Sequence, residues 1–171
     1  MTRILSSARL QLREIEDSDA AFLLQLLNTR DFINNIGDRG VRTLDESRHY
    51  IESNIRASYR QHGMGLWVVE DRNSLAVLGL CGLLKRDTLQ HPDVGYAFLP
   101  KFWSQGYAIE AASAVMIYGK ETLGIKRIVA ITAPDNDASI RVLNKLGLTF
   151  AKMVKLPGAA RESRLFTPEI E

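Results

Sequence analysis

Residues 100–112 read Pro-Lys-Phe-Trp-Ser-Gln-Gly-Tyr-Ala-Ile-Glu-Ala-Ala, and they join a predicted strand, 93–99, to a predicted helix. The loop holds Ser104, Gln105 and Gly106 just before that helix. The first turn of a helix leaves backbone N–H groups without partners, and the helix dipole adds partial positive charge there. Because Gly106 has no Cβ, a ligand could approach this backbone closely. The stretch predicts a site for an anion such as a pyrophosphate, and an ordinary strand-to-helix turn with one glycine is the alternative.

The composition indicates a single domain over residues 1–171. A chain of 171 residues with 46% apolar content can bury one substantial core. The net charge is only +2 and the basic residues are dispersed, so we expect no nucleic-acid partner. No apolar stretch approaches the roughly 20 residues that cross a bilayer, so we expect no membrane partner. The single cysteine, Cys81, excludes an internal disulfide and, with no apolar leader, favours a cytoplasmic location.

The hydrophobic pattern predicts a mixed α/β fold with helices on both faces of a sheet. A capping-box pattern, Thr43 followed by Glu46, begins the second predicted helix, and Gly124 is placed to end the third. No repeated βα unit occurs, which excludes a Rossmann domain and a TIM barrel, and residues 34–40 read as an irregular loop. The predicted elements are strands at 9–13, 66–70, 75–84, 93–99, 128–131, 150–155 and, as a final edge strand, 163–166, and helices at 20–27, 43–62, 107–123 and 138–146.

Two motifs resemble those of the GNAT family of N-acetyltransferases, in the form typical of its RimJ/RimL-like branch of ribosomal-protein alanine acetyltransferases. Residues 103–108, Trp-Ser-Gln-Gly-Tyr-Ala, are similar to the acetyl-CoA loop of that branch, and a matching Glu110 follows. Asn136 and Ser139 lead into residues 142–147, Val-Leu-Asn-Lys-Leu-Gly. This segment is similar to a second motif of the branch, in which Asn-x-x-Ser is followed by Leu-Gly-Phe. The resemblance covers nearly the whole chain. It implies a GNAT fold, with a central, mostly antiparallel mixed sheet of six to seven strands that splays between the fourth and fifth.

The chain also departs from the family pattern at three positions. Ser104 replaces the usual first glycine of the loop. We expect the loop to bind acetyl-CoA still, with a shifted backbone conformation. Leu148 replaces a phenylalanine, which is a conservative change. Leu143 stands where other branches carry a tyrosine that protonates the departing thiolate, so that acid is missing.

The resemblance implies acetyl-CoA as cosubstrate and no metal. Backbone groups at Phe98 and Leu99 would pair with the pantetheine arm, since pantetheine is an amide chain that can add to an open strand edge. The N–H groups of the loop would bind the pyrophosphate. Arg141 and Lys145 could meet the 3′-phosphate or simply face solvent. The implied cofactor-binding residues are Phe98, Leu99, Trp103, Ser104, Gln105, Gly106, Tyr107, Ala108, Asn136 and Ser139.

Acetyl transfer to an amine needs a proton acceptor, a proton donor for the thiolate, and a binding site for the amine. Asp93 is the candidate base, although a water chain or a structural role in a turn would also account for it. Ser139 is the candidate donor to the thiolate, with a role at the helix start as the alternative. Trp67 and Tyr96 are candidates for the acceptor site, with core packing as the alternative.

We therefore interpret the chain as an acetyl-CoA-dependent N-acetyltransferase that acts on a primary amine by direct attack in a ternary complex. The alternative is a non-catalytic acyl-CoA-binding module, suggested by the missing tyrosine and by Ser104. The acceptor stays open among a protein amino terminus, an amino acid, an aminoglycoside and a polyamine, and residues 34–42 could gate its entry. The chain ends soon after residues 161–164, so a partner subunit in a homodimer could complete the acceptor wall.

Overall fold

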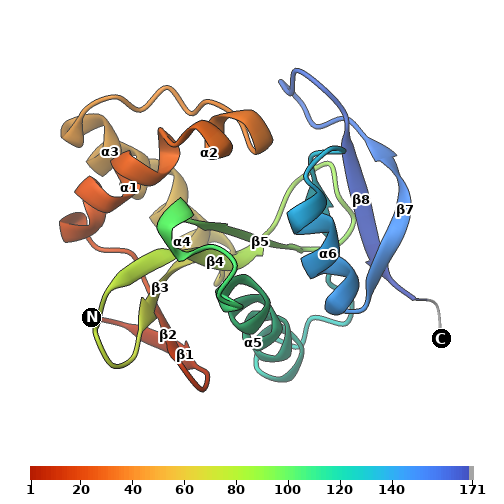
Figure 1. The fold of residues 1–171 in the computed structure, drawn as a ribbon, viewed down its shortest axis with the longest axis horizontal. Helices are drawn as coiled ribbons and strands as arrows, with labels where there is room; N and C mark the ends of the chain where they lie inside the picture. Colours follow the sequence, from red (N-terminus) through yellow and green to blue (C-terminus); the bar gives the residue numbers. More distant parts are fainter. Residues whose placement is uncertain (170–171) are drawn as a thin grey trace.

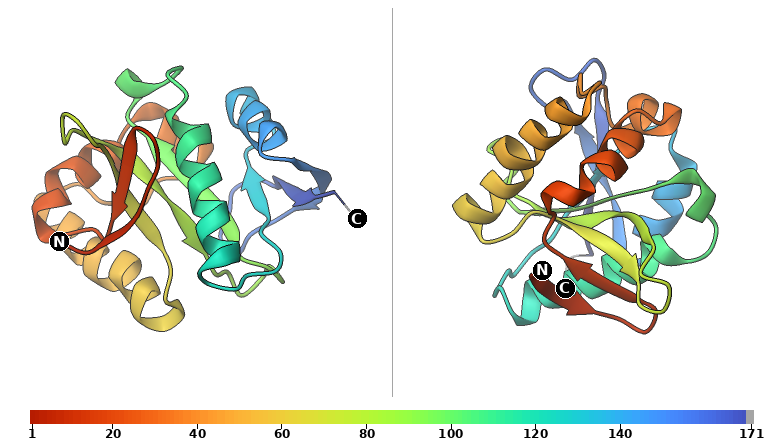
Figure 2. Two further views of the ribbon diagram at one scale, coloured as in Figure 1. Left: turned by 90° about the horizontal axis from the view of Figure 1, so that it is seen from below. Right: turned by 90° about the vertical axis from the view of Figure 1, so that its left-hand side faces the viewer.

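The computed structural model describes residues 1–169 as two β-sheets with helices packed around them (Figure 1; Figure 2). The first sheet has five strands in the order β1-β2-β3-β4-β5, and the second has three in the order β6-β8-β7. All pairings inside the two sheets are antiparallel. The strands are β1 (Arg3–Ser6), β2 (Leu10–Arg13), β3 (Leu66–Asp71), β4 (Val77–Leu84), β5 (Asp93–Phe98), β6 (Ala130–Thr132), β7 (Leu148–Val154) and β8 (Ser163–Pro168).

The two sheets meet at the start of β5. Asp93 forms a parallel bridge with Val129, just before β6. The Val94 N–H donates to the Val129 carbonyl at 2.9 Å, and the Val129 N–H donates to the Pro92 carbonyl at 3.0 Å. Beyond these bonds the strands belong to separate sheets and diverge (Figure 1). The expected splay between the strand at 93–99 and the strand near 128–131 is therefore confirmed.

The details of the sheet differ from expectation at its two ends. Eight strands form instead of six to seven, because the sequence pattern does not predict β1. Residues 3–6 read Arg-Ile-Leu-Ser, which does not alternate between polar and apolar side chains as a half-buried strand does. The expectation that the last strand lies at an edge is wrong, since β8 lies between β6 and β7. Strand order depends on long-range pairing, which the periodicity of one segment does not report.

Helices cover both faces of the five-stranded sheet. Helices α1, α3 and α4 lie with α2 on one face, where Leu23 and Ile51 pack against Val68 and Leu80 (Figure 2). Helix α5 packs on the other face, and α6 packs on the three-stranded sheet. No helix within residues 1–169 has the length and apolarity to span a membrane. The helices are α1 (Ala20–Leu27), α2 (Arg30–Asn35), α3 (Leu44–Tyr50), a π-helix (Ile51–Arg56), α4 (Ala57–His62), α5 (Tyr107–Glu121) and α6 (Asp137–Lys145).

The second predicted helix forms, but a π-helical turn interrupts it. Its capping box is confirmed, because the Thr43 hydroxyl accepts from the Glu46 N–H at 3.1 Å and the Glu46 carboxylate accepts from Thr43. The helix ends at Gly63, which adopts a left-handed φ of 67°. The segment 34–40 is irregular only after its start, since α2 runs to Asn35. The π-helical turn matters for the site because such turns often lie beside functional surfaces.

A buried ionic cluster ties the first helix to the sheet. Arg13 on β2 donates to both carboxylate oxygens of Asp19, at 2.7 and 2.8 Å, and to Glu70 on β3 at 2.7 Å. The hydrogen bond to Asp19 is the largest influence and raises the pKa of Arg13 in spite of its burial. Removing one partner would leave a buried charge unpaired, so the cluster holds the start of α1 against the sheet.

Candidate active site

The open edge of β5 forms the floor of the candidate site. Backbone groups of alternate residues in a strand point to the same side. The Val94 N–H points toward β6 and the Leu99 N–H donates to Leu78 of β4 at 3.0 Å, so the backbone groups of Tyr96 and Phe98 face the splay. The Phe98 carbonyl accepts from the Trp103 indole N–H at 2.9 Å. Of the two residues expected to pair with pantetheine, Phe98 faces the splay, whereas the Leu99 N–H is already bonded to β4. Tyr96 also faces the splay, although the sequence did not indicate it as a pairing position.

The loop before α5 adopts the strained backbone that an outward-facing anion site requires. Ser104 has φ of 60°, and Gly106 has φ of 81° and precedes the first residue of the helix, Tyr107. A left-handed conformation is costly for serine, which has a Cβ. No side chain caps this helix start, so its first backbone N–H groups have no side-chain acceptor. Ser104 therefore holds a left-handed backbone in this loop, and a shifted mode of binding stays a prediction.

The hairpin between β1 and β2 braces this loop through Glu110. The Glu110 carboxylate accepts from the Ser7 hydroxyl at 2.7 Å, from the Arg9 N–H at 2.8 Å and from Arg9 Nε at 2.7 Å. Arg9 Nη1 also donates to the Gln105 carbonyl at 3.0 Å. Burial is the largest influence on the pKa of Glu110 and would raise it, but the bonds from Ser7 and Arg9 together lower it. Sequence reasoning assigned Arg9 only to a strand, and the one available signal was the acidic residue in the first helical turn.

At the start of α6, a tyrosine and a serine share a hydrogen bond. The Tyr96 hydroxyl lies 2.8 Å from the Ser139 hydroxyl and 3.4 Å from the Ser139 carbonyl. The Asn136 side-chain oxygen accepts from the Ser139 N–H at 3.2 Å, which makes Asn136 the cap of α6. Burial raises the pKa of Tyr96 to about 12, so its phenol keeps its proton at neutral pH. Leu143 is 1% exposed and belongs to the apolar core, so it cannot supply a proton.

Asp93 and Trp67 lie in the interior. Asp93 is 1% exposed at the joined end of the two sheets, where Arg86 Nε donates to it at 2.9 Å. Burial raises the pKa of Asp93, and the charge and hydrogen bond of Arg86 partly oppose the rise. Trp67 is 2% exposed and its ring packs edge-on against Tyr118 of α5, at 5.6 Å between centroids. The structure therefore does not bring Trp67 to an open acceptor site, because its side chain points into the core beneath α5.

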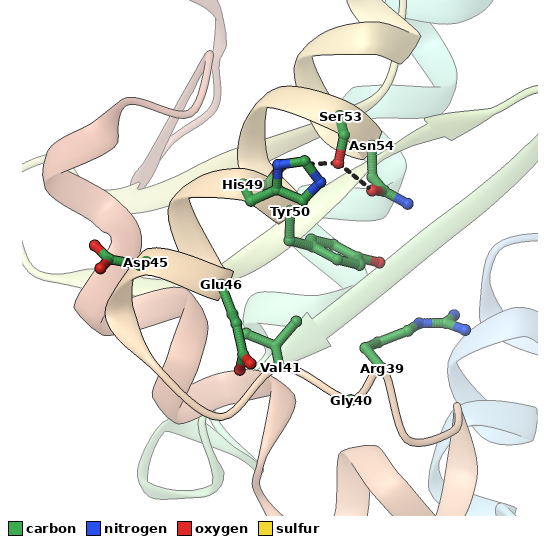
Figure 3. A pocket seen from close by; sticks show the side chains of 9 residues that line it. All are labelled: Arg39, Gly40, Val41, Asp45, Glu46, His49, Tyr50, Ser53 and Asn54. Atoms are coloured by element: carbon green, nitrogen blue, oxygen red, sulfur yellow. Dashed lines mark hydrogen bonds between the residues drawn. The ribbon is translucent and has the colours of Figure 1, made fainter.

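A cavity of about 520 Å³ lies on the face opposite α5. Figure 3 shows the side chains of Tyr50 and Arg39 pointing to the same side of the pocket, with Arg39 on the segment that also carries Val41. Val41, on the wall of the cavity, belongs to the same core cluster as Leu99, which follows β5. The segment 34–42 contributes three residues to this wall, and its role as a gate stays a prediction. The lining residues are Arg39, Gly40, Val41, Asp45, Glu46, His49, Tyr50, Ser53 and Asn54.

The loop between β7 and β8 reaches across the splay. Arg161 donates to Asp135, at the start of the α6 segment, and to the Asn34 carbonyl at the end of α2, both at 3.1 Å. Arg161 therefore links the start of the α6 segment to the end of α2. Arg141 and Lys145 are exposed on α6, where a phosphate or solvent could reach them. Within residues 1–169 no cluster of three potential metal ligands occurs.

Comparisons with known proteins agree with this geometry. The family profile described as "Acetyltransferase (GNAT) domain" matches residues 9–149. The protein YkkB of Bacillus subtilis is 32% identical, covering 88% of both chains. The N-acetyltransferase YoaA of Bacillus subtilis is 30% identical, covering 86% of this chain and 83% of that protein.

Solved structures show the same fold. The ribosomal L7/L12 alpha-N-protein acetyltransferase RimL, solved with coenzyme A, superposes with a TM-score of 0.82 at 19% identity, covering 98% of both chains. At this identity the likeness concerns the fold. The family profile and the two Bacillus relatives together establish that this chain belongs to the GNAT family and is an N-acetyltransferase.

Proposed function

We propose that the protein transfers the acetyl group of acetyl-CoA to a primary amine by direct attack in a ternary complex. The observation that carries this proposal is the open edge of β5, which has an uncapped helix start at one side and a serine hydroxyl at the other. Pantetheine would lie along the edge near Tyr96 and Phe98, and the pyrophosphate would meet the N–H groups of residues 105–108.

The proton balance of this reaction assigns roles to Ser139 and Tyr96. The amine nitrogen attacks the thioester carbonyl, the C–S bond breaks, and the sulfur leaves as a thiolate that must gain a proton. In our proposal the Ser139 hydroxyl gives its proton to the thiolate and takes one from the Tyr96 phenol, 2.8 Å away. Solvent then returns a proton to Tyr96. This pair supplies the acid that Leu143 lacks.

The proton that leaves the amine needs a separate acceptor. Asp93 is our candidate, and its carboxylate would act through intervening water because the side chain is buried beside Arg86. A raised pKa suits a base that works near neutral pH, and burial moves the pKa of Asp93 in that direction. Direct contact between Asp93 and the amine is not part of the proposal.

For the acceptor we propose an amino terminus of a peptide or protein that enters over the cavity near Tyr50. Two features support this choice. The cavity is open at the surface and has His49 and Glu46 on its wall, so it suits an extended chain better than a small enclosed molecule. The structural neighbour RimL is named as an acetyltransferase of a ribosomal protein amino terminus. Another neighbour is named as a spermidine acetyltransferase, so polyamines belong in the test.

A thiol-release assay with acetyl-CoA tests the proposal. The acceptor panel should hold peptides with different amino-terminal residues, amino acids, aminoglycosides and polyamines, with calorimetry of CoA binding alongside. We expect nanomolar to micromolar CoA binding and turnover on peptide amines. CoA binding without turnover on any acceptor would favour a non-catalytic acyl-CoA-binding module, the alternative that Leu143 and Ser104 support. Turnover on polyamines alone would keep the reaction and overturn the peptide acceptor.

A further inference from the structure

The loop that would bind the pyrophosphate carries no cationic side chain of its own. Residues 103–108 contain no lysine or arginine, and the indole N–H of Trp103 is already bonded to Phe98. The nearby Lys101 ammonium lies over the Phe102 ring, 5.0 Å from its centroid. A pyrophosphate carries more negative charge than one helix start offsets, since the helix dipole supplies about half an elementary charge. A cation from another segment would complete the site.

Arg9 occupies that position, although it lies on the hairpin between β1 and β2. A Cβ built on Gly106 would lie 3.3 Å from Arg9 Nη2, so this nitrogen is next to the exposed face of the glycine. The guanidinium also lies over the Tyr107 ring, 4.6 Å from its centroid. Its side chain is 45% exposed, so it can reach a ligand on the loop. Arg9 therefore borders both residues at which α5 begins.

Arg9 is also held in one orientation by three groups. Nε donates to Glu110, Nη1 donates to the Gln105 carbonyl, and the planar face stacks on Tyr107. Among the described residues Nη2 has no hydrogen-bond partner, so its N–H group on the side away from Nε is free to donate to a ligand. A planar guanidinium fixed in this way loses little entropy when it binds a phosphate. The arrangement is that of a preorganised phosphate donor.

The bond to Gln105 has a second effect on the loop. A carbonyl oxygen next to the phosphate path would repel an anion, and Nη1 of Arg9 neutralises part of its negative charge. The same bond fixes the peptide between Gln105 and Gly106, whose left-handed φ of 81° directs the following N–H groups outward. Glu110 in turn has its charge balanced by Arg9, so it does not oppose the ligand.

We propose that Arg9 is a binding residue for the pyrophosphate of the acyl-CoA donor, with Nη2 as the donating group and Glu110 as the residue that orients it. The inference rests on the proposed function, since it assumes that acetyl-CoA occupies the loop. It adds to that function a specific residue, distant in sequence, that recognises the diphosphate of the donor and not its pantetheine arm.

The test compares two acetyl donors that differ in the diphosphate. Acetyl-CoA carries it, and S-acetyl-pantetheine lacks it. In Arg9→Gln we expect kcat/KM for acetyl-CoA to fall about 10- to 100-fold, the loss typical of one charge-assisted bond, and kcat/KM for S-acetyl-pantetheine to stay within about twofold. The Kd for CoA measured by calorimetry should rise by the same factor as kcat/KM falls.

Arg72→Gln is the matched control. Arg72 lies beside the same hairpin and donates to the Ser7 carbonyl at 2.8 Å, so its loss removes an equal charge and a contact of the same kind. We expect this variant to bind CoA within about twofold of the wild type, because the Arg72 side chain donates to the hairpin backbone at Ser7 and Ala8 and has no hydrogen bond with the loop at residues 103–108. Arg9→Lys keeps the positive charge but lacks the planar set of N–H donors of a guanidinium, so its affinity for CoA should fall by an intermediate factor. This variant also serves as the test if Arg9→Gln fails to fold.

Three outcomes would overturn the inference. Equal losses on both donors would mean that Arg9 only supports the fold. Unchanged affinity for CoA in Arg9→Gln would remove it from the site, as would equal losses in Arg72→Gln. A wild-type protein that binds no CoA would instead contradict the proposed function, which is a separate result from any of these.

Discussion

The two helices that pack beside the splayed strands β5 and β6 begin in opposite ways. Helix α5 follows Gly106 in a left-handed conformation and has no side-chain cap, whereas α6 follows Asn136, whose side chain accepts from the Ser139 N–H. A capped helix start has used part of its capacity to bind an anion, and an uncapped one keeps that capacity for a ligand. The difference assigns recognition of the donor to α5 backbone groups and proton transfer to the side chains at the start of α6.

A charge placed at the start of α5 is the strongest way to break this comparison. We expect Gly106→Glu to weaken CoA binding more than about 100-fold, because the carboxylate would occupy the phosphate position and repel it. The control is Gly124→Glu beyond the other end of the same helix, where φ is 68° and no atom lies within 4 Å of the added Cβ. Calorimetry of CoA binding measures both. Equal affinity in Gly106→Glu and the wild type would mean that the loop is misassigned.

At α6 the comparison predicts a loss of rate without a loss of donor binding. Ser139→Ala should lower kcat about 100-fold, the usual contribution of a general acid, and leave the Kd for CoA within about threefold. Tyr96→Phe should lower kcat less, and the double variant should lose no more than Ser139→Ala, because the two groups act in series. Additive losses would show that Tyr96 and Ser139 act independently, and the proposed proton transfer between them would be wrong.

The buried phenol of Tyr96 sharpens the comparison through pH. Its pKa is raised to about 12 from an ordinary value near 10, so the protonated form is favoured in the folded state. The raised pKa of Tyr96 contributes at most about 2.7 kcal/mol to the free energy of unfolding. This contribution is fully present below about pH 10 and is lost as the pH rises through about 12.

Urea denaturation of the wild type and of Tyr96→Phe between pH 9 and 12 measures this difference. The free energy of unfolding of the wild type should decline more steeply than that of the variant above about pH 10. Parallel curves would mean that the phenol is as accessible to deprotonation in the folded state as in the unfolded chain. Absorbance near 295 nm reports phenolate formation by all five tyrosines, so the difference between the wild type and Tyr96→Phe isolates the titration of Tyr96.

The smallest effect is expected at Asp93, at the joined end of the sheets. If its carboxylate accepts the amine proton through water, Asp93→Asn should lower kcat about three- to tenfold and change the acid limb of the kcat profile. Arg86→Gln removes the partner of Asp93 and serves as a control for the buried pair, since both variants disturb the same hydrogen bond. An unchanged rate and pH profile in Asp93→Asn would exclude this carboxylate as the base.

Local signals in the sequence account well for the parts of the fold made by near neighbours. The capping box at Thr43, the hairpin of β3 and β4 and the start of α6 at Asn136 all form as expected, because each depends on residues a few positions apart. The failures concern position in the tertiary structure. The place of β8 in its sheet and the burial of Trp67 depend on how distant segments pack.

By itself, the sequence determined the family, the splayed sheet and the loop at residues 103–108, since that loop is a contiguous segment whose conformation depends on Ser104 and Gly106. Only the tertiary structure decided which side chains complete the site. Arg9 meets Gln105 across 96 positions and Tyr96 meets Ser139 across 43. Periodicity and motif spacing report contacts within one element, whereas these pairs form only when the sheet, hairpin and helices have packed.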